Sequence, residues 1–225
     1  MNLEQARFNM IEQQIRPWDV LDASVLQLLA LVKREDFVPL AHKALAFVDM
    51  EVPLTSPTDE AMRLGQCMLA PRVEARLLQD LAVQRHEKVL EVGAGSGYMA
   101  ALLAHRAQRV ISLEIDADLA ALARTNLQKA GIHNAEVRCA DGAKGKAPEG
   151  PFDVIVLSGS LAEVPHALLA QLKVGGRLAA IIGNEPMMRA TLVTRVSDTD
   201  FRTVQPWDTV APRLLNFPEP SRFSF

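Results

Sequence analysis

The stretch VLEVGAGSGY, residues 89–98, decides how this chain folds. Residues 88–92 predict a short buried strand, and glycines follow at positions 93, 95 and 97. Glycine lets the backbone turn sharply and lets a ligand approach without a Cβ in the way. The apolar residues at 99–107 predict a helix whose N-terminus points at that ligand. The stretch therefore predicts a strand, a glycine-rich binding turn and a helix.

The alternation of strands and helices continues towards the C-terminus. Further strands are predicted at 109–114, 135–141, 152–158 and 176–183, and helices at 116–131 and 166–172. Such alternation is typical of βαβ units in a mainly parallel, doubly wound sheet. Two later stretches, 190–196 and 201–206, predict an antiparallel hairpin at the sheet edge. We therefore expect an α/β, Rossmann-like fold with about seven strands.

The first third of the chain is predicted to be helical. Helices are expected at 3–15, 22–33 and 72–83, the last with Val73, Leu77, Leu78 and Leu81 facing inward. Residues 52–66 contain two prolines, one glycine and several turn formers, which predicts an exposed loop. The expected fold thus carries an N-terminal helical extension.

The 225 residues are predicted to form a single domain, 1–225. The sequence has no internal repeat and no interdomain linker. Residues 1–84 are expected to supply helices and a loop, and residues 85–225 the sheet with a C-terminal strand addition. The hydrophobic share of 49% is ample for one core.

Composition excludes several classes of partner. The net charge is −3, from 24 basic and 27 acidic residues, so no basic surplus indicates nucleic acid or an anionic membrane. The N-terminal residues lack the apolar region of a signal peptide, and no apolar run reaches the roughly 18 residues of a membrane span. Cys67 and Cys139 predict neither a disulfide framework nor a metal site, and Cys139 is expected in the core. We expect a cytoplasmic protein.

Acidic residues are predicted at the carboxyl ends of three consecutive strands, the rim where ligands bind in open α/β folds. Glu91 precedes the first glycine by two positions and could pair with an ammonium group. Glu114 ends the second strand and could accept both hydroxyls of a ribose. Asp141, followed by Gly142, ends the third strand and could reach an adenine amino group. Together they predict a ligand site at this rim, with an ordinary turn as the alternative interpretation of Asp141-Gly142.

The spacing of the glycines separates two cofactor classes. A dinucleotide fingerprint places its last glycine five positions after the first, where this chain has Tyr98. The pattern E-x-G-x-G-x-G instead resembles motif I of the S-adenosylmethionine-dependent methyltransferases. A nicotinamide-binding site is the alternative. The predicted cofactor-binding residues are Glu91, Gly93, Ala94, Gly95, Gly97, Glu114, Ile115, Asp141 and Gly142.

Longer motifs carry a more specific resemblance. They are MIEQQIRPWDVLDASVL (10–26), REDFVP (34–39), KVLEVGAGSGYMAALLA (88–104), CADG (139–142) and PFDVIVLSGSLAEVPHALLAQLKVGGRL (151–178). Over most of its length the chain resembles the protein-L-isoaspartate O-methyltransferase family. The resemblance implies methyl transfer from S-adenosylmethionine to the free α-carboxylate of isoaspartyl residues in damaged proteins, with S-adenosylhomocysteine as the product. The ester then closes to a succinimide that can reopen to aspartate, which repairs the protein.

The segment GQCMLAP, residues 65–71, resembles the substrate loop of that family, G-Q-T-I-S-x-P. The resemblance makes Gln66, Cys67, Met68 and Pro71 substrate-loop residues and places Leu69 at the family's catalytic serine. That serine orients the acceptor carboxylate by a hydrogen bond, whereas leucine has no hydrogen-bonding group. An unpaired buried carboxylate is costly. Cys67 is interpreted as a packing or cofactor contact, since no histidine lies near it in the sequence to activate it.

Leu69 leaves two alternatives open at this stage. One is a diverged methyltransferase that acts on another acceptor, such as a small carboxylate or a phenol. The other is a protein that binds S-adenosylmethionine without catalysis.

The segment DTVAPRLLNF, residues 208–217, resembles the part of the family's chain that passes over the peptide site. Its backbone would pair with an extended substrate, and Arg213 could meet a carboxylate there. The residues after it, 218–225, are expected to be loosely held.

Overall fold

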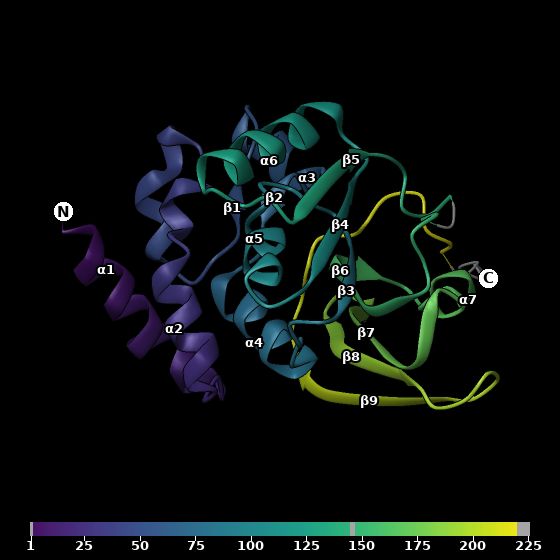
Figure 1. The fold of residues 1–225 in the computed structure, drawn as a ribbon. Coiled ribbons are helices and arrows are strands. Elements are labelled where there is room, and N and C mark those ends of the chain that lie inside the picture. The colour runs from purple at the N-terminus through teal and green to yellow at the C-terminus, as the bar shows by residue number, and fades with distance from the viewer. Residues whose placement is uncertain (1, 145–146, 220–225) are drawn as a thin grey trace.

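A seven-stranded sheet runs through the middle of the protein, shown as a computed structural model that describes residues 2–144 and 147–219 (Figure 1). Its strands are β3 (Lys88–Val92), β4 (Arg109–Glu114), β5 (Ala135–Cys139), β6 (Phe152–Leu161), β7 (Leu172–Asn184), β8 (Met187–Arg195) and β9 (Phe201–Asp208). They lie in the order β5-β4-β3-β6-β7-β8-β9. Strands β3 to β7 are parallel to one another, and β8 and β9 continue the sheet from β7 in antiparallel pairing. The predicted sheet and edge hairpin are confirmed.

The strand order creates a binding crevice. From β3 the chain steps outward to β4 and β5, then returns to place β6 on the other side of β3. The connections after β3 and β6 therefore leave the sheet in opposite directions. Ligands of open α/β sheets bind outside the carboxyl ends of the strands at such a point.

Alternate residues of the strands enter two separate cores, because successive side chains point to opposite faces. On β3, Val89 belongs to the larger core and Leu90 to the smaller one. On β4, Val110 and Ile111 divide in the same way. Glu91 therefore points to the same face as Val89, and this orientation places it beneath the glycine turn.

Helices cover both faces of the sheet. The α-helices are α1 (Leu3–Met10), α2 (Ala23–Leu31), α3 (Thr58–Arg63), α4 (Pro71–Leu81), α5 (Tyr98–Ala104), α6 (Ala117–Lys129) and α7 (His166–Leu169). Helices α4, α5 and α6 pack in the larger core together with the N-terminal helices, and α7 packs in the smaller core (Figure 1). All four predicted inward residues of α4 are buried.

The N-terminal extension contains more irregular helix than the sequence predicts. After α1 the chain continues through a π-helix (Ile11–Ile15) and a 3₁₀ turn (Arg16–Trp18). Two further 3₁₀ segments, Arg34–Asp36 and Leu40–Phe47, follow α2. Asp22 caps the N-terminus of α2, where its side chain accepts a hydrogen bond of 2.8 Å from the Ser24 N–H.

Residues 52–66 are not the exposed loop that we predicted. They contain strand β1 (Val52–Pro53) and helix α3, and β1 pairs with β2 (Cys67–Met68). Val52, Leu54 and Ala61 are buried. Prolines and turn formers mark local bends, but they carry no information on the apolar side chains that tertiary packing buries here.

Two smaller predictions about strands were also wrong. Cys139 is exposed rather than in the core, because it ends β5, the outermost strand of the sheet. Strand β6 continues three residues beyond its predicted end to Leu161. Its added length pairs with the C-terminal segment, since the Ser160 N–H donates to the Pro212 carbonyl at 2.7 Å.

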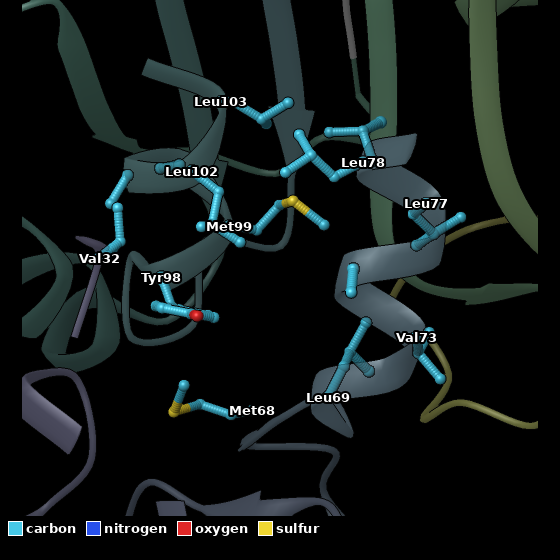
Figure 2. Close-up of a cluster of buried hydrophobic side chains, with 14 of the residues drawn as sticks. Val32, Met68, Leu69, Val73, Leu77, Leu78, Tyr98, Met99, Leu102 and Leu103 are labelled. Carbon is cyan, nitrogen blue, oxygen red and sulfur yellow. The ribbon is translucent and has the colours of Figure 1, made fainter. Parts of the chain in front are cut away.

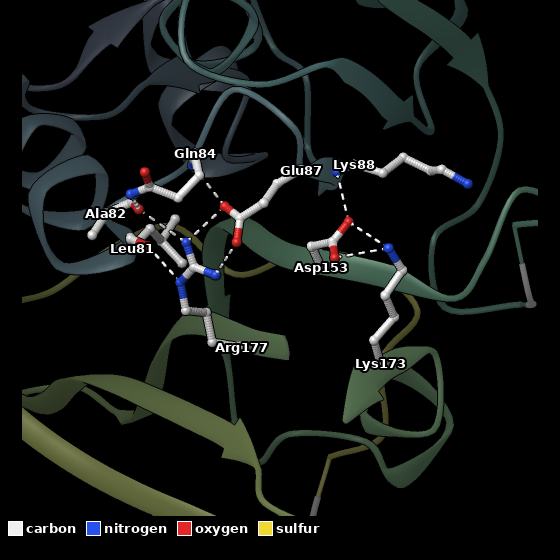
Figure 3. Close-up of polar contacts among 8 residues, drawn as sticks. All are labelled: Leu81, Ala82, Gln84, Glu87, Lys88, Asp153, Lys173 and Arg177. Atoms are coloured by element: carbon white, nitrogen blue, oxygen red, sulfur yellow. Dashed lines mark hydrogen bonds and ion pairs between the residues drawn. The ribbon is translucent and has the colours of Figure 1, made fainter. Parts of the chain in front are cut away.

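Ion pairs connect neighbouring elements at the end of the sheet that lies away from the crevice (Figure 3). The Arg177 guanidinium donates to the Glu87 carboxylate at 2.7 and 2.9 Å and to the carbonyl of Ala82 after α4 at 3.1 Å. Asp153 accepts from the Lys88 N–H and from the Lys173 ammonium, both at 2.8 Å. These contacts tie α4 and three strands together away from the crevice.

Within residues 2–144 and 147–219, no helix is both long enough and apolar enough to cross a membrane.

Candidate functional site

A cavity of about 280 Å³ opens at the carboxyl ends of β3, β4, β5 and β6. The predicted residues Gln66, Cys67, Gly93, Gly95, Glu114, Ile115, Asp141 and Gly142 line it. Segments far apart in the sequence thus meet at the crevice that the strand order creates. Its volume is close to the lower end of the range for small-molecule pockets, which begins at roughly 300 Å³.

The glycine turn has a left-handed backbone that residues with a Cβ rarely adopt. Gly93, Gly95 and Gly97 have φ angles of +92°, +52° and +85°. A Cβ on Gly97 would also lie 3.1 Å from the Ala123 carbonyl oxygen of α6. Gly97 therefore lets α5 and α6 approach each other, while Gly93 and Gly95 expose backbone to the cavity.

Glu114 connects the end of β4 to the glycine turn. Its carboxylate accepts hydrogen bonds from the Gly95 N–H at 2.8 Å and the Asp116 N–H at 3.1 Å. Burial raises the pKa of Glu114, although these N–H groups favour its charged form. A carboxylate has about four acceptor positions, so positions remain for hydroxyl groups of a ligand in the cavity.

Asp141 also lines the cavity. Its carboxylate accepts from the Ala143 N–H at 2.9 Å and from the Asn216 side-chain amide at 2.8 Å. Burial works against the charged form, but these hydrogen bonds and Lys144 hold the pKa of Asp141 below its usual value. Sequence reasoning missed Asn216, because only the fold brings the C-terminal segment to β5.

The C-terminal segment forms one wall of the cavity. The Leu214 N–H donates to the Ser160 carbonyl at 3.0 Å, which aligns the segment with the end of β6. A Cβ on Gly93 would lie 3.0 Å from Leu214 Cδ2, so the leucine packs directly on the glycine turn. Arg213 also lines the cavity, and its guanidinium donates to the Asn184 side chain at 2.6 Å. Residues 220–225, part of the tail predicted to be loosely held, lie outside the described residues.

The segment 65–71 is held firmly at the edge of the cavity. Met68 pairs with Val52 across the β1–β2 ladder, and Pro71 is the first residue of α4. The Gln66 side chain accepts from the Thr55 hydroxyl at 2.7 Å and donates to Asp116 at 3.0 Å. The predicted substrate loop therefore has a fixed backbone.

A second cavity, of about 20 Å³, lies behind the glycine turn. It is lined by Cys67, Met68, Leu69, Glu74, Glu91, Gly93, Ala94, Gly95, Ser96, Tyr98, Met99 and Ser158. Leu69 is only 5% exposed and does not line the larger cavity. Figure 2 shows Met68 and Leu69 among buried side chains of α4 and α5. The two cavities share Cys67, Gly93, Gly95 and Ser158, so they adjoin at the turn.

Glu91 lies in this second cavity rather than in the larger one. It is 0% exposed, and its carboxylate accepts from the hydroxyls of Ser112 at 2.6 Å and Ser158 at 2.9 Å. Burial raises the pKa of Glu91 to about 7. Burial also raises the pKa of Cys67, to about 12, so this cysteine is a neutral thiol and no nucleophile at neutral pH.

A buried ion pair beside Leu69 was missed from the sequence. The Arg34 guanidinium, fully buried, donates to the Glu74 carboxylate and, at 2.8 Å, to the Leu69 carbonyl. Burial raises the pKa of Glu74 against the effect of Arg34. Glu74 lies one turn before Leu78 on the inward face of α4, and a charged residue at such a position was the available signal.

The fold and site together define the class of protein. The features are a mainly parallel sheet, a glycine turn after β3 and a carboxylate at the end of β4. Such a site belongs to a Rossmann-like S-adenosylmethionine-dependent methyltransferase. The family model of the protein-L-isoaspartate(D-aspartate) O-methyltransferases matches residues 5–208. The chain belongs to this family.

Relatives support the same assignment over most of the chain. A protein-L-isoaspartate O-methyltransferase of Koribacter versatilis is 38% identical over 193 residues, 86% of this chain and 82% of the relative. Protein-L-isoaspartate O-methyltransferase 2 of Marinobacter nauticus is 37% identical over 201 residues, 89% of this chain and 88% of the relative.

A solved structure shares the fold. It is a putative protein-L-isoaspartate O-methyltransferase from Plasmodium falciparum in complex with S-adenosyl-L-homocysteine. It superposes with a TM-score of 0.76 at 19% identity and covers 92% of this chain and 97% of its own.

Proposed function

We propose that this enzyme transfers the methyl group of S-adenosylmethionine to the free α-carboxylate of L-isoaspartyl residues in damaged proteins. One observation carries the proposal: a family match over residues 5–208 coincides with a cavity whose rim carries the family's cofactor motif. The acceptor loop 65–71 borders the same cavity. We propose the cytoplasm as the place where it acts.

The residues of the larger cavity fit this cofactor. Glu114 would hold the ribose hydroxyls, and Ile115, which is 39% exposed, offers an apolar surface beside them. Asp141 and Gly142 would border the adenine, with Asn216 keeping the Asp141 carboxylate in place. The backbone of Gly93, Ala94 and Gly95, with Gly97 allowing the turn, would lie against the amino-acid part. The polar groups along the cavity therefore suit a nucleoside joined to an amino acid.

Glu91 does not line the cofactor cavity, so it would act on the cofactor through another residue. Its carboxylate lies on the far side of the turn, where Ser112 and Ser158 hold it. Ser158 lines both cavities. We propose that Glu91 acts on the ammonium group of the cofactor from this position, with the Ser158 hydroxyl between them.

The reaction requires positioning rather than acid–base chemistry. The cofactor supplies an electrophilic methyl group on a sulfonium. An α-carboxylate is ionised at neutral pH, because its reference pKa is about 3.5, so this chain needs no general base. The loop 65–71 and the C-terminal segment would align the carboxylate and exclude water. Ser160 pairs in parallel with the C-terminal segment through the backbone of Pro212 and Leu214. The backbone N–H and C=O of Arg213 therefore point away from β6, where an extended peptide could pair with them.

The test is transfer of labelled methyl groups from S-adenosylmethionine by the full chain. The substrate is an isoaspartyl peptide, and the matched control is the same peptide with normal aspartate. We expect label in the isoaspartyl peptide alone. No transfer above the aspartyl control, with S-adenosylhomocysteine binding demonstrated by calorimetry, would contradict the proposal.

A further inference from the structure

The hydroxyl that orients the acceptor carboxylate in this family is absent at Leu69. We propose that the Tyr98 hydroxyl supplies the missing hydrogen bond from the opposite side of the small cavity. The inference rests on the proposed isoaspartyl activity and assigns Tyr98 as the donor to one oxygen of the acceptor.

The size of the small cavity suits a single oxygen atom. Its volume of about 20 Å³ exceeds the roughly 10–15 Å³ that one water-sized group requires. Leu69 and Tyr98 both line it. The leucine offers only apolar surface, so a donor to an oxygen held there must come from another residue.

The Tyr98 hydroxyl is a donor without an acceptor. The side chain is 1% exposed, and its oxygen has no hydrogen-bond partner within residues 2–144 and 147–219. A buried hydroxyl left unpaired costs free energy, so its position beside a cavity that can hold an oxygen atom points to a bound oxygen. Burial also raises the pKa of Tyr98, so the phenol keeps its proton at neutral pH.

Neighbouring side chains hold the phenol ring in place. Phe37 meets it edge-on with ring centroids 5.4 Å apart, and the Arg34 guanidinium lies 5.3 Å from the ring centre. Figure 2 shows the Tyr98 side chain between α5 and the segment that carries Met68 and Leu69. A donor fixed in this way loses little conformational entropy when an acceptor oxygen arrives.

The charges around the small cavity permit a negative oxygen. The guanidinium of Arg34 compensates the carboxylate of Glu74. Burial raises the pKa of Glu91 to about 7, so this carboxyl carries a proton in many molecules near neutral pH. Cys67 is a neutral thiol. The acceptor oxygen therefore does not enter between two uncompensated negative charges.

The small cavity also adjoins the site of methyl transfer. It shares Gly93, Gly95 and Ser158 with the cofactor cavity. One oxygen of a carboxylate held by Tyr98 would leave the other oxygen directed towards the glycine turn. This arrangement orients the attacking oxygen as the in-line reaction requires.

The test is the variant Tyr98→Phe, which keeps the ring and removes only the hydroxyl. We expect kcat/KM for the isoaspartyl peptide to fall roughly ten- to hundredfold, the effect of one hydrogen bond to a charged group. Affinity for S-adenosylhomocysteine should stay unchanged, and Tm should stay the same or rise because an unpaired hydroxyl is gone. Wild-type kcat/KM in this variant would overturn the proposal.

A second variant separates this role from packing. In the Tyr98→Phe background, Leu69→Ser should restore kcat/KM, because it returns a hydroxyl to the same cavity from the loop side. Ala70→Ser is the matched control, since residue 70 belongs to the same loop but does not line the cavity. A loss of activity accompanied by lower Tm and weaker S-adenosylhomocysteine binding would assign Tyr98 to packing. Absence of isoaspartyl activity in the wild type would instead overturn the proposed function on which the inference rests.

Discussion

At the scale of single residues, burial changes the chemistry of the site more than residue type does. Glu91 and Glu114 are both predicted cofactor residues at strand ends. Yet Glu91 is sealed beneath the turn between two serine hydroxyls, while Glu114 lines the larger cavity and holds the Gly95 N–H. The sequence indicates where a carboxylate occurs, but its pKa depends on which neighbours the fold supplies.

The raised pKa of Glu91 predicts a pH-dependent cost in stability. The folded protein holds this proton up to a pH of about 7, whereas the unfolded chain loses it near the ordinary glutamate pKa of 4.5. Stability should therefore fall as pH rises through this interval. The variant Glu91→Gln lacks this titration. The difference in unfolding free energy between this variant and the wild type should therefore shift by about 3 kcal/mol in favour of the variant between pH 4.5 and pH 8.

Urea unfolding at several pH values measures this difference. Glu136→Gln is the control, because Arg138 and Arg109 lower the pKa of Glu136 to about 2. Its stability change relative to the wild type should stay constant above pH 4.5. A pH-independent difference for Glu91→Gln would contradict the assigned environment of Glu91.

At the scale of elements, central strands and long helices were predictable and the irregular segments were not. Strands β3 and β4 begin and end at the predicted residues. Both strands are buried on both faces of the sheet, so their sequences are nearly continuous apolar runs that can be recognised locally. The pairing of β1 with β2 and the bridge from Ser160 to the C-terminal segment join residues distant in sequence. Such contacts leave no local pattern.

The contact between α5 and α6 predicts different costs for two glycine substitutions. Gly97 and Gly131 both have positive φ angles, +85° and +69°. Only Gly97 is crowded, by Ala123, whereas a Cβ on Gly131 would meet nothing within 4 Å. Gly131→Ala should cost about 1 kcal/mol for its backbone, and Gly97→Ala about 1–3 kcal/mol more for the forced separation of the helices.

Chemical denaturation of the two variants measures both costs under one set of conditions. Because both glycines have left-handed backbones, the difference between the variants isolates the steric contact. Equal losses of stability would show that α5 and α6 do not need the close approach at Gly97.

At the scale of the whole molecule, one continuous core joins the N-terminal helices to the sheet. Met10, Leu29, Leu78 and Val110 belong to the same buried cluster. The Arg34–Glu74 ion pair joins the extension to α4 within it. We therefore expect a single cooperative unfolding transition and propose a single domain.

Cofactor binding should stabilise this unit as a whole. S-adenosylhomocysteine at 100 times its Kd should add about 2.7 kcal/mol. For a chain of 225 residues this corresponds to a rise in Tm of roughly 5–10 °C, measurable by calorimetry. Glu114→Ala should show a much smaller rise at the same ligand concentration, because its carboxylate would no longer hold the ribose. An equal rise in both proteins would contradict the role of Glu114.

The sequence alone determined the class of fold, the glycine turn and the occurrence of carboxylates near three strand ends, because these depend on local patterns of apolar residues and glycines. Only the tertiary structure decided what surrounds Glu91 and Leu69. Strand pairing placed Glu91 beside Ser112 and Ser158, and packing of α4 against α5 brought Tyr98 and Leu69 to one cavity. These contacts arise between segments that touch only after the sheet has formed, so a side chain's partners, and hence its chemistry, follow from the fold.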